Sequence, residues 1–365
     1  MSGLYVHVPF CLTRCGYCDF NAYAGLGHLA DRYASALRRE AAIAAPAWRG
    51  VRVDTVFFGG GTPTTLAPST LVGILSELKE RFEIAPDAEV TVEANPDTVD
   101  ERSLTELRQG GFTRLSIGAQ SFDPTVLAAL ERVHGAGSVR RAFAAAGGAG
   151  FDNVNVDLIF GTLGEAMSSW RRTLGEALAL GPAHVSCYAL TVEPATPLGR
   201  RVAAGVSATP DPDVQAELYE AAVESLGAEG YVHYEVSNWA RPGFECRHNL
   251  GYWRREAYLG LGAGAHSHRD GRRWWNVRPP MAYLEEVERG ALPTGGEERL
   301  GAGEATLEEV FLGLRTRTGV PAASVPAGRE EPYMAAGLLS RREDRFVLTD
   351  RGMFLAGEVA TGLVG

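Results

Sequence analysis

The sequence predicts an α/β protein, a partial, TIM-like (β/α)6 barrel followed by a small C-terminal helical or winged-helix-like domain. Two observations support this fold. From residue 4 to about residue 240, short β-branched runs alternate with amphipathic segments, which is typical of βα units around a parallel sheet. After about residue 241 this alternation stops. In such a barrel the functional residues lie at the carboxyl ends of the strands.

Six strands account for the barrel. We expect them at residues 4–9, 53–58, 89–94, 114–119, 153–160 and 184–190. Between the second and third strands a helix is predicted after Pro68, with an apolar face formed by Leu71, Ile74, Leu75, Leu78 and Phe82. A doubly wound open sheet is the alternative, but its nucleotide-binding fingerprint would open the first helix, and cysteines occupy that turn here.

The remainder of the chain divides into two further parts. A stretch rich in Gly, Trp and His runs from about residue 241 to 290 and has the composition of a binding site. Residues 293–303, rich in Gly and Glu, resemble a linker. The last block begins with one apolar helical face, formed by Leu307, Val310, Phe311 and Leu314. We therefore predict a barrel over 1–240, an extension over 241–292 and a C-terminal domain over 304–365.

Composition excludes several classes of function. The net charge of -10 and the sequence pI near 5.4 disfavour nucleic-acid binding. Neither a secretory signal nor an apolar run of the roughly 18 to 20 residues that span a membrane is present, so we expect a cytoplasmic protein without an integral membrane segment. Three of the five cysteines fall within eight residues, a spacing that indicates reduced thiols and a metal centre.

The three clustered cysteines form the segment Cys11-Leu-Thr-Arg-Cys15-Gly-Tyr-Cys18. Three thiolates in one loop can ligate three irons of a [4Fe–4S] cluster and leave the fourth iron open. S-adenosylmethionine (SAM) can chelate that iron through its amino and carboxylate groups, and an electron from the cluster can break its S–C5′ bond. The alternative is a structural zinc site, with His7 or the distant Cys246 as fourth ligand.

Further motifs resemble a known superfamily. The C-x3-C-x2-C spacing follows a Tyr-x-His-x-Pro-Phe strand and precedes the run Gly59-Gly60-Gly61-Thr62-Pro63, a combination that resembles radical SAM proteins. Segments 92–96, 116–122, 155–159 and 248–253 resemble the HemN/HemW branch of that superfamily, and the likeness covers nearly the whole chain. The resemblance implies a radical SAM barrel that holds the cluster on Cys11, Cys15 and Cys18.

The resemblance also implies a SAM site. Gly60, Gly61 and Thr62 would offer main-chain groups to the SAM ammonium, although a plain tight turn would also explain the glycines. Glu93 ends the third strand and suits an ammonium or ribose hydroxyls. Tyr5 resembles another SAM contact, with a half-buried strand aromatic as the alternative.

Three positions match contacts to a second SAM molecule or to the substrate in this branch: Gln120, Arg132 and Asp157. Arg132 suits a carboxylate, and its alternative is a solvated charge at a helix end. His266 lies where the family places an adenosine contact, made mainly through the backbone.

One departure separates two subfamilies. The oxygen-independent coproporphyrinogen III oxidases of this branch continue the cluster motif as Cys-x-Cys, whereas Asp19 and Phe20 follow Cys18 here. Phe20 cannot ligate iron, so decarboxylation of porphyrinogens is not expected. The motif His248-Asn249-x-x-Tyr252-Trp253 is shared with the haem-handling members, and His248 could ligate haem iron or merely cap a turn.

The resemblance therefore implies a haem chaperone. Such a protein would bind haem, carry the cluster and SAM, accept electrons from a donor and deliver haem to acceptor haemoproteins such as respiratory enzymes. The alternative is an oxygen-independent coproporphyrinogen III oxidase in which Arg132 orients a substrate carboxylate. A zinc-binding adaptor is the third hypothesis, and it would leave the run Gly59 to Thr62 without a function.

Overall fold

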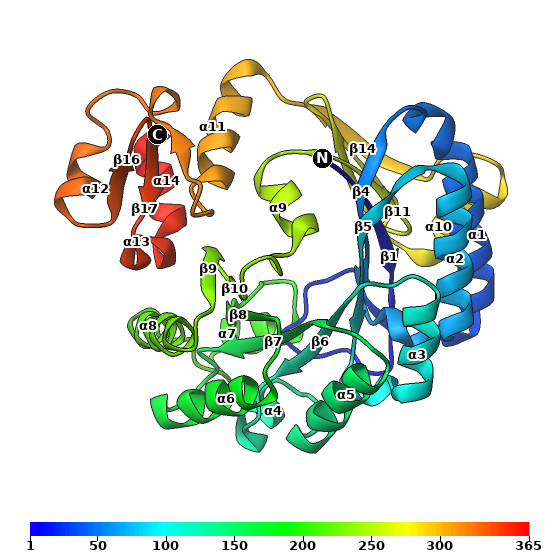
Figure 1. Ribbon diagram of the computed structural model, residues 1–365, viewed down its shortest axis with the longest axis horizontal. Helices are drawn as coiled ribbons and strands as arrows, with labels where there is room; N and C mark the ends of the chain where they lie inside the picture. The colour runs from blue at the N-terminus through cyan, green and yellow to red at the C-terminus, as the bar shows by residue number, and fades with distance from the viewer. Residues whose placement is uncertain (365) are drawn as a thin grey trace.

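The computed structural model describes residues 1–364, and its centre is one curved sheet of twelve strands. Six parallel strands form the middle of this sheet: β1 (Ser2–Val8), β4 (Arg52–Gly60), β5 (Glu83–Ala94), β6 (Arg114–Gln120), β7 (Asn153–Phe160) and β8 (His184–Ala189). They agree with the six predicted strands, with ends that shift by a few residues. The α/β prediction is confirmed, and the sheet bends into an arc without closing (Figure 1).

Helices cover the convex side of this arc (Figure 1). The predicted helix after the second strand is α2 (Pro68–Arg81), and Leu71, Ile74, Leu75 and Leu78 are at most 2% exposed. This apolar face packs on the sheet, as the helical spacing indicates. The other outer helices are α1 (Ala30–Ala44), α3 (Glu101–Gln109), α4 (Pro124–Ala129), α5 (Ala136–Gly148), α6 (Met167–Leu180), α7 (Pro197–Ala203) and α8 (Pro212–Ala228).

The sheet continues on both sides of the six central strands. At one end β10 (Asn238–Ala240) and β9 (Val232–Glu235) follow β8 in antiparallel order. At the other end β11 (Ala257–Leu261) pairs parallel with β1, and three antiparallel strands follow: β12 (His266–Arg269), β13 (Arg272–Asn276) and β14 (Thr294–Arg299). The Gly-, Trp- and His-rich stretch thus extends the same sheet.

The expected linker over 293–303 is wrong for its first half, because β14 is a paired edge strand. Helix α10 (Pro280–Glu288) precedes β14 and packs against α1. The division of the chain at residues 240 and 292 therefore stays a proposal. No helix within residues 1–364 is long and apolar enough to cross a bilayer.

The C-terminal domain combines helices with a three-stranded sheet, ordered β15-β17-β16. Its elements are α11 (Ala302–Gly313), β15 (Val320–Pro321), α12 (Glu331–Ala335), β16 (Leu339–Arg342), β17 (Arg345–Leu348), α13 (Asp350–Phe354) and α14 (Ala356–Val364). Val310 and Leu314 of the predicted apolar face are buried, whereas Leu307 is 43% exposed. The buried pair joins the hydrophobic core on the β7 and β8 side of the barrel.

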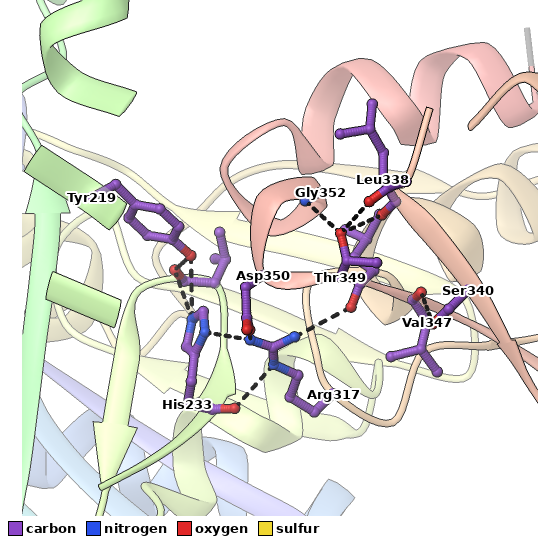
Figure 2. A network of polar contacts seen from close by, with 12 residues as sticks. Tyr219, His233, Arg317, Leu338, Ser340, Val347, Thr349, Asp350 and Gly352 are labelled. Carbon is purple, nitrogen blue, oxygen red and sulfur yellow. Dashed lines mark hydrogen bonds and ion pairs between the residues drawn. The ribbon is translucent and has the colours of Figure 1, made fainter. Parts of the chain in front are cut away.

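Arg317 fastens this domain to the barrel edge (Figure 2). Its guanidinium donates to the His233 carbonyl at 3.2 Å, to His233 Nδ1 at 2.7 Å and to the Leu348 carbonyl at 3.2 Å, and it pairs with Asp350. Because an arginine can only donate, Nδ1 of His233 must carry no proton. Burial, followed by the charge of Arg317, lowers the pKa of His233 to about 4, which agrees with a neutral ring. We name this contact the Arg317 anchor.

Candidate functional site

A cavity of about 920 Å³ lies inside the arc of the sheet. Side chains from β1 and from β4 through β8 line one side, and Glu93, near the carboxyl end of β5, and Asp157 of β7 are among them. Helix α9 (Arg247–Trp253) stands within the arc and lines another side (Figure 1). Strands β12 and β13, together with α11 of the C-terminal domain, complete the wall. This volume lies at the upper end of the range for small-molecule sites.

The three motif cysteines lie in and after β2 (Phe10–Cys11), a short strand beyond β1, and all three thiols are free and partly exposed. Burial raises the pKa of Cys11 and of Cys18, and the neighbouring thiols of the loop raise both further. Arg132 donates from Nη1 to Cys15 Sγ at 3.5 Å, which places a cation against one sulfur. Three thiols in one loop beside a cation are a donor set that fits an iron–sulfur cluster.

Both residues proposed as the fourth zinc ligand, His7 and Cys246, are already engaged in other contacts. The two ring nitrogens of His7 are taken, Nδ1 by the Tyr5 hydroxyl at 3.0 Å and Nε2 by the Asn21 carbonyl at 2.9 Å. Cys246 is fully buried, and its thiol donates to Glu89 at 3.6 Å. Across residues 1–364, no three His, Cys, Asp or Glu side chains converge as they would around a single metal ion.

The glycine run packs tightly on the strand that leads into the cysteine loop. Gly60 has φ +111°, and a Cβ there would stand 2.5 Å from the His7 ring. A Cβ on Gly61 would stand 2.6 Å from the Phe10 carbonyl. Thr62 donates its backbone N–H to that carbonyl at 2.7 Å, and its Oγ1 lies 3.5 Å from Cys11 Sγ. The run is therefore more than a plain turn, because it fixes the position of the cysteine loop, and Gly60 also lines the cavity.

Two carboxyl groups, Glu93 and Asp157, line the cavity close enough to influence each other's charge, and we call this part of it the cavity floor. Burial, followed by the charge of Asp157, raises the pKa of Glu93 to about 8, although the Gly60 N–H donates to it at 3.1 Å. Burial also raises the pKa of Asp157, which accepts hydrogen bonds from Ser116 at 2.9 Å and Asn155 at 2.8 Å. Both groups therefore hold protons more strongly than exposed carboxylates do.

Arg132 and Gln120 lie next to this floor. Arg132 donates from Nη2 to the Gly118 carbonyl at 2.9 Å as well as to Cys15, so it bridges β6 and the cysteine loop. It is not the solvated helix-end charge of the alternative reading. Gln120 ends β6 in the left-handed conformation, with φ +64°, but it does not line the cavity.

Tyr5, Phe57 and His248 form a row of stacked rings along the cavity wall. Ring centroids lie 6.2 Å apart between Tyr5 and Phe57, and 5.1 Å apart between Phe57 and His248. Tyr5 is half-buried, as its alternative reading states, and it also lines the cavity. Burial raises the pKa of Tyr5 and holds its hydroxyl neutral. The row gives the cavity an apolar side.

Both ring nitrogens of His248 are engaged. Nδ1 shares a hydrogen bond with Thr55 Oγ1 at 2.8 Å, and Nε2 shares one with the Tyr252 hydroxyl at 2.8 Å. Burial, with a smaller effect of the Arg114 charge, lowers the pKa of His248 to about 3, so the ring is neutral. Glu89 accepts from the backbone N–H groups of Arg247 and His248, both at 3.1 Å, and so caps α9. Ligation of haem iron by His248 would require Tyr252 to release its bond.

Sequence reasoning missed most of the wall formed by β12, β13 and α11. His266 stacks on Trp275 with ring centroids 5.6 Å apart, and Arg255, Arg273 and Glu308 lie on the same wall. The detectable signal is the alternation on β13, where Arg273 and Trp275 share the face opposite Arg272 and Trp274. Arg114 was also missed, a buried cation of β6 that lines the cavity and whose Nε has no partner among the described residues.

Comparison with known proteins identifies the family of the chain. Residues 5–177 match the radical SAM superfamily, and residues 302–355 match the HemN C-terminal domain. The chain is 47% identical to the heme chaperone HemW of Mycobacterium tuberculosis over all of this chain and 95% of the relative. It is 34% identical to the Bacillus subtilis heme chaperone HemW over the full length of both.

Among solved structures, coproporphyrinogen III oxidase (HemN) from Escherichia coli, a radical SAM enzyme, superposes with a TM-score of 0.86. The superposition covers 99% of this chain and 89% of the oxidase, at 24% identity. At that identity the likeness shows a shared fold and nothing about the reaction.

Proposed function

The chain belongs to the HemW family, in the HemN/HemW branch of the radical SAM superfamily, and on this premise we propose that it is a haem chaperone. In this proposal it carries a [4Fe–4S] cluster and SAM, binds haem in the barrel cavity and delivers it to acceptor haemoproteins such as respiratory enzymes. An electron donor serves the cluster, and the protein acts in the cytoplasm.

The shape and lining of the cavity are the observation that carries the proposal. Its 920 Å³ are lined by eight aromatic side chains, Tyr5, Phe20, Phe57, Tyr188, Tyr252, Trp253, Tyr258 and Trp275. Flat aromatic side chains pack well against a flat macrocycle, and their polar ends still find hydrogen-bond partners. A large, aromatic-lined cavity beside the cysteine loop therefore suits haem.

In this proposal the cysteine loop holds the cluster, and residues around the cavity floor bind SAM and haem. Cys11, Cys15 and Cys18 would hold the cluster, which supplies one-electron reduction of the SAM sulfonium. Tyr5, Gly60, Gly61, Thr62 and Glu93 would bind SAM, and Gln120, Arg132 and Asp157 would contact a second SAM or the haem. Because the Glu93 and Asp157 carboxyls hold protons in the cavity, a cationic ligand there would favour their ionised forms and release protons on binding.

His248 belongs to the proposed haem site as a wall residue. Its ring lies beside Phe57 and Tyr252, which both line the cavity, so a haem packed there would touch the motif helix α9. If His248 ligates haem iron, its Nε2 must give up the hydrogen bond to the Tyr252 hydroxyl and bind the metal instead. Cys246 is a poorer candidate for that role, because it is fully buried, does not line the cavity and donates its thiol proton to Glu89.

Haem titration of the anaerobically reconstituted protein tests the proposal. Trp275→Ala should weaken haem binding. Trp274 precedes Trp275 on β13 and lies on the opposite face, so Trp274→Ala should leave haem binding unchanged. Haem loaded on the parent should then move to an apo-haemoprotein, followed by the Soret band. Absence of haem binding, or equal effects of the two substitutions, would contradict a haem site in this cavity.

A parallel assay addresses the oxidase alternative. Coproporphyrinogen III, SAM and a reductant should yield no protoporphyrinogen, because Phe20 stands where the oxidases have a cysteine. Phe20→Cys alone should not create the activity, since a substrate site needs more than one residue. Repeated turnover by the parent protein would establish the oxidase in place of the chaperone.

A further inference from the structure

Glu308 of α11 holds two arginines on the cavity wall. Its Oε2 accepts from Arg255 Nε at 2.9 Å, and its Oε1 pairs with Arg273. The three side chains are between 17% and 29% exposed, and all of them line the cavity. We name this group the Glu308 clasp. A carboxylate between two guanidinium groups is a strong, geometrically specific contact.

The two arginines come from elements that the barrel fixes firmly. Arg273 lies on β13, whose neighbours β12 and β14 set its direction. Arg255 follows α9 directly and adopts the left-handed conformation, with φ +56°, which an arginine rarely occupies. It also donates from Nη1 to the Ala305 carbonyl of α11 at 3.0 Å. Such conformations persist where the surrounding contacts hold them, often at ligand clamps.

Only one member of the clasp belongs to the C-terminal domain. Glu308 lies on α11, whereas Arg273 lies on β13 of the curved sheet and Arg255 lies between α9 and β11. The Arg317 anchor attaches the same domain to the barrel at the β9 edge. The clasp can therefore open while the anchor keeps the domain in place.

We propose that Arg255 and Arg273 form a carboxylate-binding site of the cavity and that Glu308 fills this site until a carboxylate-bearing ligand replaces it. The inference rests on the proposed function, because haem carries two propionate carboxylates. The incoming carboxylate takes over the two guanidinium groups, and α11 loses the two ion pairs of Glu308 with the barrel wall while it keeps the hydrogen bond from Arg255 to the Ala305 carbonyl. Loading of the cavity thereby loosens the first helix of the C-terminal domain.

The site makes a forecast that a purely structural ion pair does not make. Iron-free protoporphyrin IX has the two carboxylates of haem, and its dimethyl ester has the same ring without the charges. The wild-type protein should bind the free acid about tenfold more tightly than the ester, as expected for one charge-assisted contact. Quenching of protein tryptophan fluorescence measures both affinities without involving the iron.

Two substitutions locate this preference, and two others serve as controls. Glu308→Gln should strengthen binding of the free acid several-fold and leave the ester unchanged, because Arg255 then has no carboxylate partner and Arg273 keeps only its pair with Glu298 at 3.3 Å. Arg273→Gln should remove most of the difference between acid and ester. Glu297→Gln and Arg272→Gln are the matched controls, because this ion pair joins β13 to β14 on the face of β13 away from the cavity, and both should behave like the parent.

Hydrogen exchange of α11 provides a readout that does not depend on any variant. Protoporphyrin IX should speed exchange of the 302–313 amides, and the dimethyl ester should not. Equal affinity for acid and ester together with no effect of Glu308→Gln would overturn the carboxylate site even if haem binds and is transferred. If the acid preference follows Glu308 but haem transfer fails, the site stands and the chaperone function falls. Binding of neither porphyrin would overturn both.

Discussion

His248→Ala should destabilise the protein strongly, because this ring is a fixed part of the cavity wall. The side chain is 3% exposed, stacks on Phe57 and shares hydrogen bonds with Thr55 and Tyr252, both at 2.8 Å. Thr55 is itself only 3% exposed, so its hydroxyl would be left without a partner. Tyr252 lines the cavity, where water can replace the lost bond at smaller cost.

The size of the effect follows from these contacts. An orphaned buried hydroxyl costs about 1 to 3 kcal/mol, and truncation of a large buried ring adds about 2 kcal/mol for lost packing. We therefore expect the free energy of unfolding to fall by about 3 to 5 kcal/mol. A loss of this size lies in the upper part of the range for single substitutions.

Urea unfolding of the cluster-free protein, followed by circular dichroism, measures the loss as a shift of the midpoint at constant slope. His266→Ala is the matched control, because His266 is exposed to the same cavity and its ring makes no hydrogen bond within residues 1–364. The control should stay within about 0.5 kcal/mol of the parent. If His248→Ala unfolds with the parent while its haem spectrum loses a nitrogen ligand, the ring is an iron ligand and the structural argument is wrong.

Three further outcomes follow from the site. Cys11→Ala, Cys15→Ala and Cys18→Ala should each abolish the broad charge-transfer absorption and the roughly four irons per chain of the reconstituted parent; stoichiometric zinc without iron in the parent would contradict the cluster. SAM should perturb the electron paramagnetic resonance spectrum of the reduced cluster, and Gly60→Val should weaken that effect, because a Cβ there meets His7; a spectrum indifferent to saturating SAM would argue against an open iron. The third outcome is a pH dependence: burial raises the pKa of Glu93 from 4.5 to about 8, so the folded protein keeps a proton that the unfolded chain loses, and the stability this gives is lost as pH rises between those values. Between pH 5.5 and 7.5 the parent should therefore lose stability relative to Glu93→Gln, by at most about 1.4 kcal/mol per pH unit, and parallel urea midpoints would refute the assignment.

The barrel strands could be predicted from sequence because each is a buried β-branched run between amphipathic helices. β7 spans the predicted residues 153–160, and β5 differs mainly by beginning earlier, at Glu83. The strands β11 to β14 could not be predicted in this way. β12 and β13 are short and consist largely of His, Arg and Trp, and β11 owes its place to parallel pairing with β1, which lies about 250 residues away in the chain. Such pairing leaves no local pattern.

The same distinction between local patterns and long-range contacts holds for the residues of the site. The cysteine loop, the glycine run and the acids Glu93 and Asp157 could be predicted from short motifs. The structure places both acids on the floor of the cavity. The Glu308 clasp joins three elements that are remote in sequence, so no local pattern reveals it. The engagement of both His248 nitrogens was equally hidden, because Thr55 lies 193 residues before it.

The contacts of α9 explain how the motif helix and the C-terminal domain can have separate tasks. A seven-residue helix is not stable alone, so its position depends on the residues that hold it. Glu89 holds its amino end and Thr55 holds His248 in its first turn, and both partners belong to strands of the barrel. Only Arg255, just beyond its carboxyl end, is held by the other domain. Opening of the Glu308 clasp would therefore move α11 and leave His248 and Tyr252 where they are, so the aromatic wall can keep a bound ring while the domain above it changes its contacts.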